Sequence, residues 1–296
     1  MTGTRRSLLY GVLLLLMLWA AFPGRWAWNE HRLAKAEEEK KAALARKARA
    51  LYEEKCRTVA GEKIYRTVLD VEGIVLLKVR PQAGGREWAD LMWPGAAFAL
   101  ESRADEYITT FLGYEQSSRE GVPVTPDRRG YINTNYVPEN ASNLPGYRYV
   151  DVIDEKDGQR YRYTGSNKVV GKKDITAPNV QLGIKNDPTY DLNVYQWTLV
   201  KGLAPDPSPR YGVTFEDHVI PDERALGVAS STVRVLDIKT GEVLGEMTRF
   251  AWGSTKPSGF NPTPWLTAWK CPAHGVGANA ATRKFVDQVL VPRSNH

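Results

Sequence analysis

The chain has 296 residues, of which 42% are hydrophobic and 25% are charged, and its formal net charge is +6. This composition indicates one large folded domain or two modest ones and excludes a disordered or low-complexity chain. Residues 1–57 hold 12 Lys and Arg against 6 Asp and Glu, whereas the remainder holds 28 of each kind. Because nucleic-acid affinity depends largely on basic residues that neutralise phosphates, the electroneutral remainder argues against a nucleic-acid partner.

The N-terminal segment of residues 7–24 carries no charge and is dominated by the run LLYGVLLLLMLWAAF. Its length suits a helix that crosses a hydrocarbon core of about 30 Å. Aromatic rings with a polar edge favour the headgroup region, and three tryptophans cluster towards the C-terminal end of the segment: Trp19, Trp26 and Trp28. We therefore expect residues 1–28 to form a single-pass transmembrane anchor that meets the membrane through residues 7–24. The alternative is a cleaved signal peptide.

Two observations on the orientation of the chain oppose one another. More basic residues follow the apolar segment than precede it, so the positive-inside rule alone leaves the large C-terminal region in the cytoplasm. The first 22 residues resemble an export signal, however, and Cys56 and Cys271 are an isolated pair of the kind that one disulfide leaves. We expect this disulfide and an exported region, with two buried free thiols in a cytosolic fold as the alternative.

Residues 29–55 predict a helical stalk. They lack Gly and Pro and consist mainly of Ala, Glu, Lys, Arg and Leu, which are strong helix formers. Their apolar positions form a narrow stripe without sustained heptads, so a solvated spacer is favoured over a coiled coil.

Residues 56–296 predict a soluble head rich in β-structure, because short runs of Val, Ile, Thr and Tyr alternate with Gly, Pro, Asn and Asp clusters. The turn dipeptide Asp157-Gly158 and the turn Lys239-Thr240-Gly241 indicate two hairpins. A short helix is expected over residues 282–290, and the fold class is α+β with a mainly antiparallel sheet. The expected strands are Gly73 to Val79, Tyr107 to Tyr114, Tyr147 to Ile153, Gln159 to Thr164, Val194 to Val200, Tyr211 to Phe215, Ser231 to Asp237 and Glu242 to Ala251.

Motifs typical of catalysis are missing, since the chain contains no G-x-S-x-G, S-x-x-K, P-loop or G-x-G-x-x-G pattern. Glu216, Asp217 and His218 could bind a cation or act as acid and base, but on a strand Asp217 points away from the other two. The alternative is a polar turn. Cys271 and His274 have a spacing that suits zinc but lack companion ligands. We therefore expect no catalytic residue, no metal and no cofactor.

The loop of residues 253–269 predicts a binding surface, because loops that combine Pro, Gly and aromatic residues commonly present one. Its aromatic candidates are Phe260, Trp265 and Trp269, and ordinary core packing is the alternative for each. Together with residues 216–218 they are the candidate contacts for a protein partner.

The stretch RYGVTFEDHVIPDERALGVASSTVRVLDIKTGEVLGEMTRFAWG, residues 210–253, resembles a group of uncharacterised proteobacterial envelope proteins. Glu216-Asp217 matches their acidic turn and Asp222-Glu223-Arg224 their charged tripeptide, whereas Ala225-Leu226 departs from the aromatic residue expected next. Pro264-Trp265 and Cys271-Pro272 extend the similarity.

Some members of that group resemble immunity partners of type VI secretion lipase effectors. The resemblance implies a non-enzymatic protein of the bacterial inner membrane, with its head in the periplasm, that binds and neutralises a toxin. An envelope assembly or structural factor is the alternative, as is an envelope hydrolase that uses Glu216, Asp217 and His218.

Overall fold

The structure, a computed structural model, describes residues 3–112, 146–273 and 280–293. Within these ranges, the side chains of residues 3–25, 27, 166–168 and 195–198 are outside the description. The chain divides into two compact units, Met1–Leu51 and Tyr52–His296.

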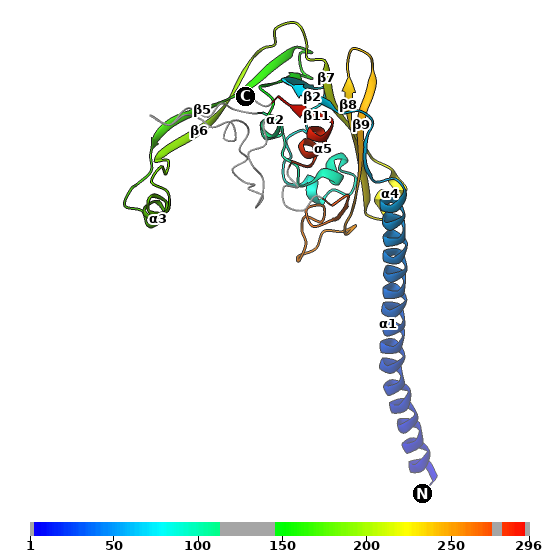
Figure 1. Cartoon of the computed structure of the whole chain (residues 1–296). Coiled ribbons are helices and arrows are strands. Elements are labelled where there is room, and N and C mark those ends of the chain that lie inside the picture. Colours follow the sequence, from blue (N-terminus) through cyan, green and yellow to red (C-terminus); the bar gives the residue numbers. More distant parts are fainter. Residues whose placement is uncertain (1–2, 113–145, 274–279, 294–296) are drawn as a thin grey trace. The chain divides into compact units, whose positions relative to one another are not determined.

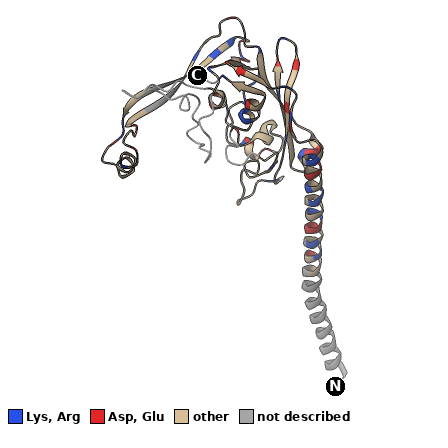
Figure 2. Ribbon diagram, viewed as in Figure 1, with Lys and Arg blue, Asp and Glu red and all other residues tan. Residues whose placement is uncertain are grey.

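The first unit is the greater part of helix α1 (Gly3–Thr58), which is continuous through the expected anchor and stalk (Figure 1). The helix predicted for residues 29–55 is confirmed. Acidic and basic residues intermingle along its described part (Figure 2), where an exposed ion pair joins Glu37 to Lys41 at 3.2 Å, one helical turn apart. Among the described residues, no helix combines the length and the apolar character needed to cross a membrane. The side chains of residues 7–24 lie outside the described ones.

The second unit is a mixed α+β domain that is mainly sheet (Figure 1). Its strands are β1 (Gly61–Ile64), β2 (Val68–Val71), β3 (Gly73–Leu76), β4 (Tyr149–Ile153), β5 (Arg160–Lys172), β6 (Asn193–Leu203), β7 (Tyr211–His218), β8 (Val228–Asp237), β9 (Glu242–Trp252), β10 (Trp269–Cys271) and β11 (Leu290–Pro292). Its α-helices, besides the end of α1, are α2 (Asp105–Phe111), α3 (Pro178–Asn186), α4 (Pro221–Ala225) and α5 (Ala281–Val289), and its 3-10 helices are η1 (Glu87–Ala89) and η2 (Pro94–Phe98). The short C-terminal helix is therefore confirmed as α5.

The main sheet has the strand order β1-β9-β8-β7-β3-β4-β5-β6, and β10 pairs with β9. Both predicted hairpins form, β4 with β5 and β8 with β9. The sheet is mainly antiparallel, but β3 runs parallel to both of its neighbours, β4 and β7. A second, two-stranded sheet pairs β2 with β11 in parallel.

One predicted strand is wrong, since most of the range Tyr107 to Tyr114 lies in helix α2. Its buried residues Tyr107, Ile108 and Phe111 follow the spacing of one helical face, and the rings of Tyr107 and Phe111 meet edge to face at 5.4 Å. Asp105 and Glu106 lie in the first turn, where acidic side chains stabilise a helix by their interaction with its dipole. Residues 113 and 114 lie outside the described ones.

The strands β7, β8 and β9 have two faces with different surroundings. The inner face contacts η2 and α5 and includes Phe215, Val233 and Met247, which lie opposite one another across the three strands. Helix α5 approaches this face closely at Gly245, where an added Cβ would lie 2.7 Å from Cγ2 of Val289. The outer face carries the alternate residues and is defined here by Glu216, His218, Ser230, Thr232, Arg234, Glu246, Thr248 and Phe250.

The strands β5 and β6 are longer than predicted. Strand β4 pairs only with Arg160–Tyr163 of β5, whereas β6 pairs with β5 from Tyr161 to Lys172. Within the described residues, the rest of β5 therefore forms a two-stranded ribbon with β6, and α3 connects the two strands at its end (Figure 1). Gly165 and Lys168 break the apolar alternation, which is why the sequence pattern stopped at Thr164.

Candidate functional site

The residues Glu216, Asp217 and His218 end strand β7 and do not converge. In the register of β7 with β8, they lie opposite Thr232, Ser231 and Ser230. Because successive strand residues point to opposite faces, Asp217 belongs to the inner face and the other two to the outer face. The three side chains therefore do not form one catalytic or metal-binding group.

On the outer face, Arg234 bridges two carboxylates. Its Nη1 donates to Oε2 of Glu216 at 3.1 Å and its Nε to Oε2 of Glu246 at 2.8 Å. The hydrogen bond from Arg234, with the charge of His218, holds the pKa of Glu216 below its ordinary value. A carboxylate whose pKa is lowered in this way is a weak general base at neutral pH, because it accepts a proton only reluctantly.

His218 belongs to a separate hydrogen-bonded ladder on the same face. Its Nε2 lies 3.0 Å from Oγ1 of Thr232, which in turn lies 3.1 Å from Oγ1 of Thr248. Its Nδ1 lies 3.9 Å from Oε1 of Glu216, which is beyond hydrogen-bond distance. Glu216 and His218 thus each bind other side chains of the outer face and do not form an acid–base pair.

On the inner face, Asp217 enters a buried network. Nη1 of Arg80 donates to Oδ1 of Asp217 at 3.2 Å, and Nε of Arg80 donates to Oε2 of Glu101 at 2.5 Å. Glu101 also accepts from the start of α5, where the backbone N–H and the hydroxyl of Thr282 lie 2.7 and 2.8 Å away. Glu101 therefore joins helix α5 to Arg80 in the segment after β3, and Arg80 in turn joins strand β7.

Two more arginines lie against the same network. The guanidinium carbon of Arg80 lies 4.2 Å from the ring centroids of both Phe98 and Phe215, and that of Arg249 lies 5.1 Å from the centroid of Phe98. Arg103 stacks on Trp93 at 4.5 Å. We call Arg80, Arg103 and Arg249, with Glu101 and Asp217, the arginine cluster. Both Arg103 and Arg249 are buried, and the loss of water lowers the pKa of each.

Arg224 of α4 connects the end of β7 with the aromatic loop. Its guanidinium donates to the backbone oxygens of His218, Leu91 and Pro94, at 3.1, 3.4 and 3.5 Å. The same guanidinium lies 5.4 Å from the ring centroid of Trp265. Arg224, from the charged tripeptide of the resemblance, is thus a buried structural anchor.

Trp265 is a core residue. It is 1% exposed, and its Nε1 donates to the backbone oxygen of Asp90 at 2.7 Å. Its own backbone N–H donates to the oxygen of Trp88 at 3.3 Å. Trp265 cannot meet a partner in this conformation, so the alternative of core packing holds for it, and it fixes the loop to the domain.

The other two aromatic candidates are exposed. Phe260 is 105% exposed relative to the reference value and Trp269 is 72% exposed. The loop of residues 253–268 is closed at its base by the pairing of Trp252 with Trp269 between β9 and β10. Phe260 lies in a turn in which Ser258 and Asn261 exchange two backbone hydrogen bonds of 3.0 and 3.1 Å. The loop thus presents Phe260 at the tip of a turn that the hydrogen bonds between Ser258 and Asn261 close.

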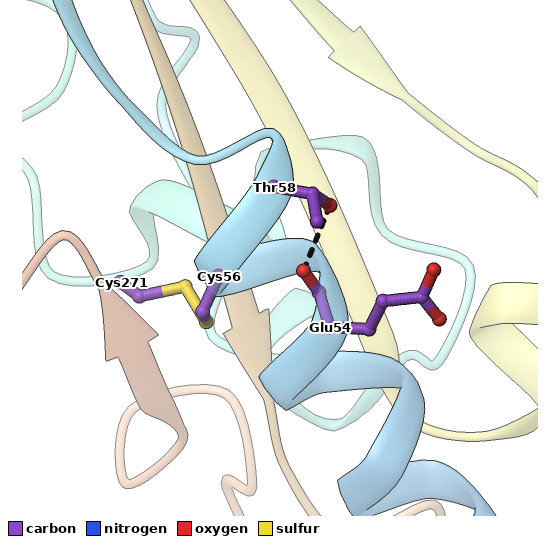
Figure 3. Close-up of a disulfide and its surroundings, with 4 residues drawn as sticks. All are labelled: Glu54, Cys56, Thr58 and Cys271. Atoms are coloured by element: carbon purple, nitrogen blue, oxygen red, sulfur yellow. Dashed lines mark hydrogen bonds between the residues drawn. A yellow bond between two sulfur atoms is a disulfide. The ribbon is translucent and has the colours of Figure 1, made fainter.

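The predicted disulfide is confirmed between Cys56 and Cys271, whose Cα atoms lie 5.7 Å apart (Figure 3). Cys56 lies in the last turns of α1, where the hydroxyl of Thr58 donates to the backbone oxygen of Glu54 at 2.8 Å. Cys271 lies in β10, two residues after Trp269. The alternative of two free thiols is wrong, and the disulfide fixes the strand that closes the aromatic loop.

No metal centre is evident in the described part of the chain, where no three His, Cys, Asp or Glu residues gather to hold an ion. His274, the other half of the Cys-x-x-His pair, lies outside the described residues. Comparisons with protein-family models, with curated proteins and with solved structures found no match to this chain. The fold and the site thus define an α+β head that is closed by a disulfide and presents an aromatic loop.

Sequence reasoning missed the arginine cluster. A signal was present in β9, where Met247, Arg249 and Ala251 share one strand face and both apolar neighbours are buried. That alternation places Arg249 on the buried side. Arg80 and Glu101 lie in irregular segments, so no periodicity indicated where their side chains point.

Proposed function

We propose that this protein is a non-enzymatic binding protein of the bacterial inner membrane, anchored through residues 7–24 with its head in the periplasm. On this proposal it is an immunity protein that neutralises a secreted antibacterial effector. The observation that carries the proposal is the full exposure of Phe260 at the tip of a closed loop.

The loop has the features of a preformed protein-binding surface. A large aromatic side chain that solvent surrounds contributes most when a partner's pocket desolvates it, and such residues dominate interface energies. The side chain of Asn261 donates to Oγ1 of Thr267 at 2.8 Å, and buried Trp265 fixes the far end of the loop. A surface held in one conformation before binding loses less entropy when a partner binds.

The charged residues near the loop favour binding over catalysis. Asp217 lies on the opposite face of β7 from Glu216 and His218, and Glu216 is paired with Arg234. A hydrolase that used these three residues would need them within reach of one substrate. This separation supports a binding role.

The disulfide supports the periplasmic location. Structural disulfides persist in oxidising compartments such as the bacterial periplasm and are rare in the cytosol. The bond between Cys56 and Cys271 therefore favours a periplasmic head over a cytoplasmic one. The resemblance to envelope proteins favours the same location.

The test is a killing competition. A strain that lacks this protein is mixed with its parent, which still delivers its effectors, and the survival of the deletion strain is counted. We expect the deletion strain to be killed, wild-type protein to restore survival, and Phe260→Ala to fail to restore it. Loss of a central aromatic anchor costs about 2 kcal/mol or more, which is roughly a 30-fold rise in Kd.

The matched control is Leu203→Ala, which removes another exposed apolar side chain, 70% exposed, from the second unit at strand β6. It should restore survival as the wild type does. If Phe260→Ala also protects fully, the loop is not the binding surface. If the deletion strain survives the attack but shows envelope defects when grown alone, the protein is an envelope assembly factor and not an immunity protein.

A further inference from the structure

The arginine cluster contains more positive than negative charge. Three guanidinium groups face two carboxylates, and Arg80 already binds both of those carboxylates, at 2.5 and 3.2 Å. Arg249 is 1% exposed, yet no hydrogen bond or ion pair joins its guanidinium to a residue that the structure describes. A buried cation without a partner is unfavourable, because water is lost and nothing replaces it.

Three unsatisfied donor groups lie around one row of the inner face. Asp217, Ser231 and Arg249 lie directly opposite one another on β7, β8 and β9. The hydroxyl oxygen of Ser231 and Nε of Arg249 are buried without a partner, and so is Nη2 of Arg80. Because Arg80 donates to Asp217 through Nη1, its guanidinium lies at the same row.

The ring of Phe98 brings the two guanidinium groups into one neighbourhood. Its centroid lies 4.2 Å from the guanidinium carbon of Arg80 and 5.1 Å from that of Arg249. Burial lowers the pKa of Arg249; attraction by Glu101 opposes this shift, and repulsion by Arg80 adds to it. Lys270 pairs with Ala251 and so faces the same side, and burial together with Arg249 lowers its pKa to about 8. The carboxylates of this neighbourhood, Glu101 and Asp217, are both bound by Arg80.

We propose that the row of Asp217, Ser231 and Arg249, completed by Arg80, is a binding site for a small oxyanion. The occupant is a free carboxylate or phosphate whose oxygens accept from Nη2 of Arg80, the hydroxyl of Ser231 and Nε of Arg249. Arginine forks match such oxyanions in geometry as well as charge. Arg80 binds the carboxylates of both Asp217 and Glu101, and the charges of Arg103 and Arg249 leave the cluster positive, so the field there favours the anion.

The approach to the site is from the end of β7. The side chain of Asp217 is 13% exposed, whereas those of Arg80 and Glu101 are 1% exposed. The side of the site nearest to solvent is therefore that of Asp217 and of Arg103, which is 8% exposed, whereas Phe98 is fully buried. The proposal concerns the inner face and is independent of the role of the aromatic loop.

The experiment uses the full chain, purified in detergent. Its thermal unfolding is followed while sodium acetate or sodium phosphate replaces sodium chloride at constant ionic strength. A ligand that binds only the folded state raises the folding equilibrium constant tenfold for each tenfold rise in concentration above Kd. We expect this dependence in the wild type and in Arg234→Gln, an outer-face control, and we expect its loss in Arg249→Gln.

Two outcomes of the unfolding experiment overturn the proposal. The first is a stability that does not depend on either anion, and the second is an equal dependence in wild type and Arg249→Gln, which indicates a general salt effect. If Arg249→Gln does not fold, Ser231→Ala replaces it and should raise the anion concentration at half-effect several-fold. A crystal structure grown in phosphate that holds only water between Arg80 and Arg249 also overturns it.

Discussion

The two faces of β7, β8 and β9 bear ion pairs of nearly equal length in opposite surroundings. Glu216 and Arg234 lie 3.1 Å apart on the outer face with side chains 57% and 35% exposed, whereas Asp217 and Arg80 lie 3.2 Å apart on the inner face at 13% and 1%. The distance between the charged groups therefore does not decide which pair contributes more to stability. Burial decides it, because the loss of water strengthens the attraction and also makes a broken pair costly.

The faces also differ in what covers them. The inner face lies under η2 and α5, which supply Phe98 and the Glu101 contact at Thr282. The outer face is covered at one end by the last turns of α1, where Tyr52 lies 5.8 Å from Trp252 and Lys55 lies 6.0 Å from Phe250. The disulfide at Cys271 belongs to this side, because Cys271 lies opposite Phe250.

The largest effect is expected when the inner network is broken at its centre. Glu101→Gln keeps the shape of the side chain but removes the more deeply buried of the two carboxylates that Arg80 binds, and we expect a loss of about 3–5 kcal/mol in the free energy of unfolding. Denaturant unfolding of the wild type and the variant measures it. Glu246→Gln on the outer face is the control and should lose less than about 1 kcal/mol. Equal losses would mean that the two faces do not differ in solvation.

The second effect concerns the cover of the outer face. Replacing Cys56 and Cys271 together by Ser should destabilise the head by about 2–4 kcal/mol, because the bond joins residues 215 apart in sequence and restricts the unfolded chain. Thermal unfolding of the double variant, compared with the oxidised wild type, gives the value, and wild type in reductant is the control that should match the variant. A double variant as stable as the oxidised wild type would show that strand pairing and packing alone hold α1 against β9.

A third effect tests the excess of cations on the inner face through pH. Burial, with the charge of Arg249, lowers the pKa of Lys270 to about 8 in the folded head, below its ordinary value of 10.5. Between these two values the unfolded chain binds more protons than the folded one, so stability rises with pH across that window. The difference in melting temperature between wild type and Lys270→Met should therefore change in favour of the wild type from pH 8 to pH 10.5. A difference that stays flat would place Lys270 in water.

The smallest effect is expected on the outer face. Arg234→Gln removes both of its ion pairs, with Glu216 and Glu246, yet exposed pairs contribute only about 0–1 kcal/mol. The same denaturant experiment should find a loss within that range, and it should shrink as salt is added. A loss above 2 kcal/mol would reverse the comparison of the two faces.

Local patterns in the sequence predicted the features that depend on near neighbours. Alternation along a strand separated Asp217 from Glu216 and His218, and the Asp157-Gly158 turn located the first hairpin. The isolated cysteines predicted their own bond. Such signals suffice because each is set by a few consecutive residues or by composition.

Features that depend on contacts between residues far apart in sequence could not be predicted from local patterns. The parallel pairing of β3 with β4 and β7 joins segments separated by long stretches of chain. Glu101 meets Thr282, 181 positions away in sequence, and Arg80 meets Asp217, 137 positions away. The sequence predicts a strand at helix α2 because its aromatic and β-branched residues have high strand propensity. Tertiary packing overrides that propensity in the folded domain.

The disulfide also makes the head a covalent ring that begins in α1 and ends in β10. A protease that cuts the chain once at any point between Cys56 and Cys271 leaves two fragments that remain one molecule until the bond is reduced. The C-terminal fragment then stays attached to the N-terminal helix, so a nicked head is not shed from whatever holds that helix. Wherever a protease meets the chain, the bond therefore preserves attachment as well as folding.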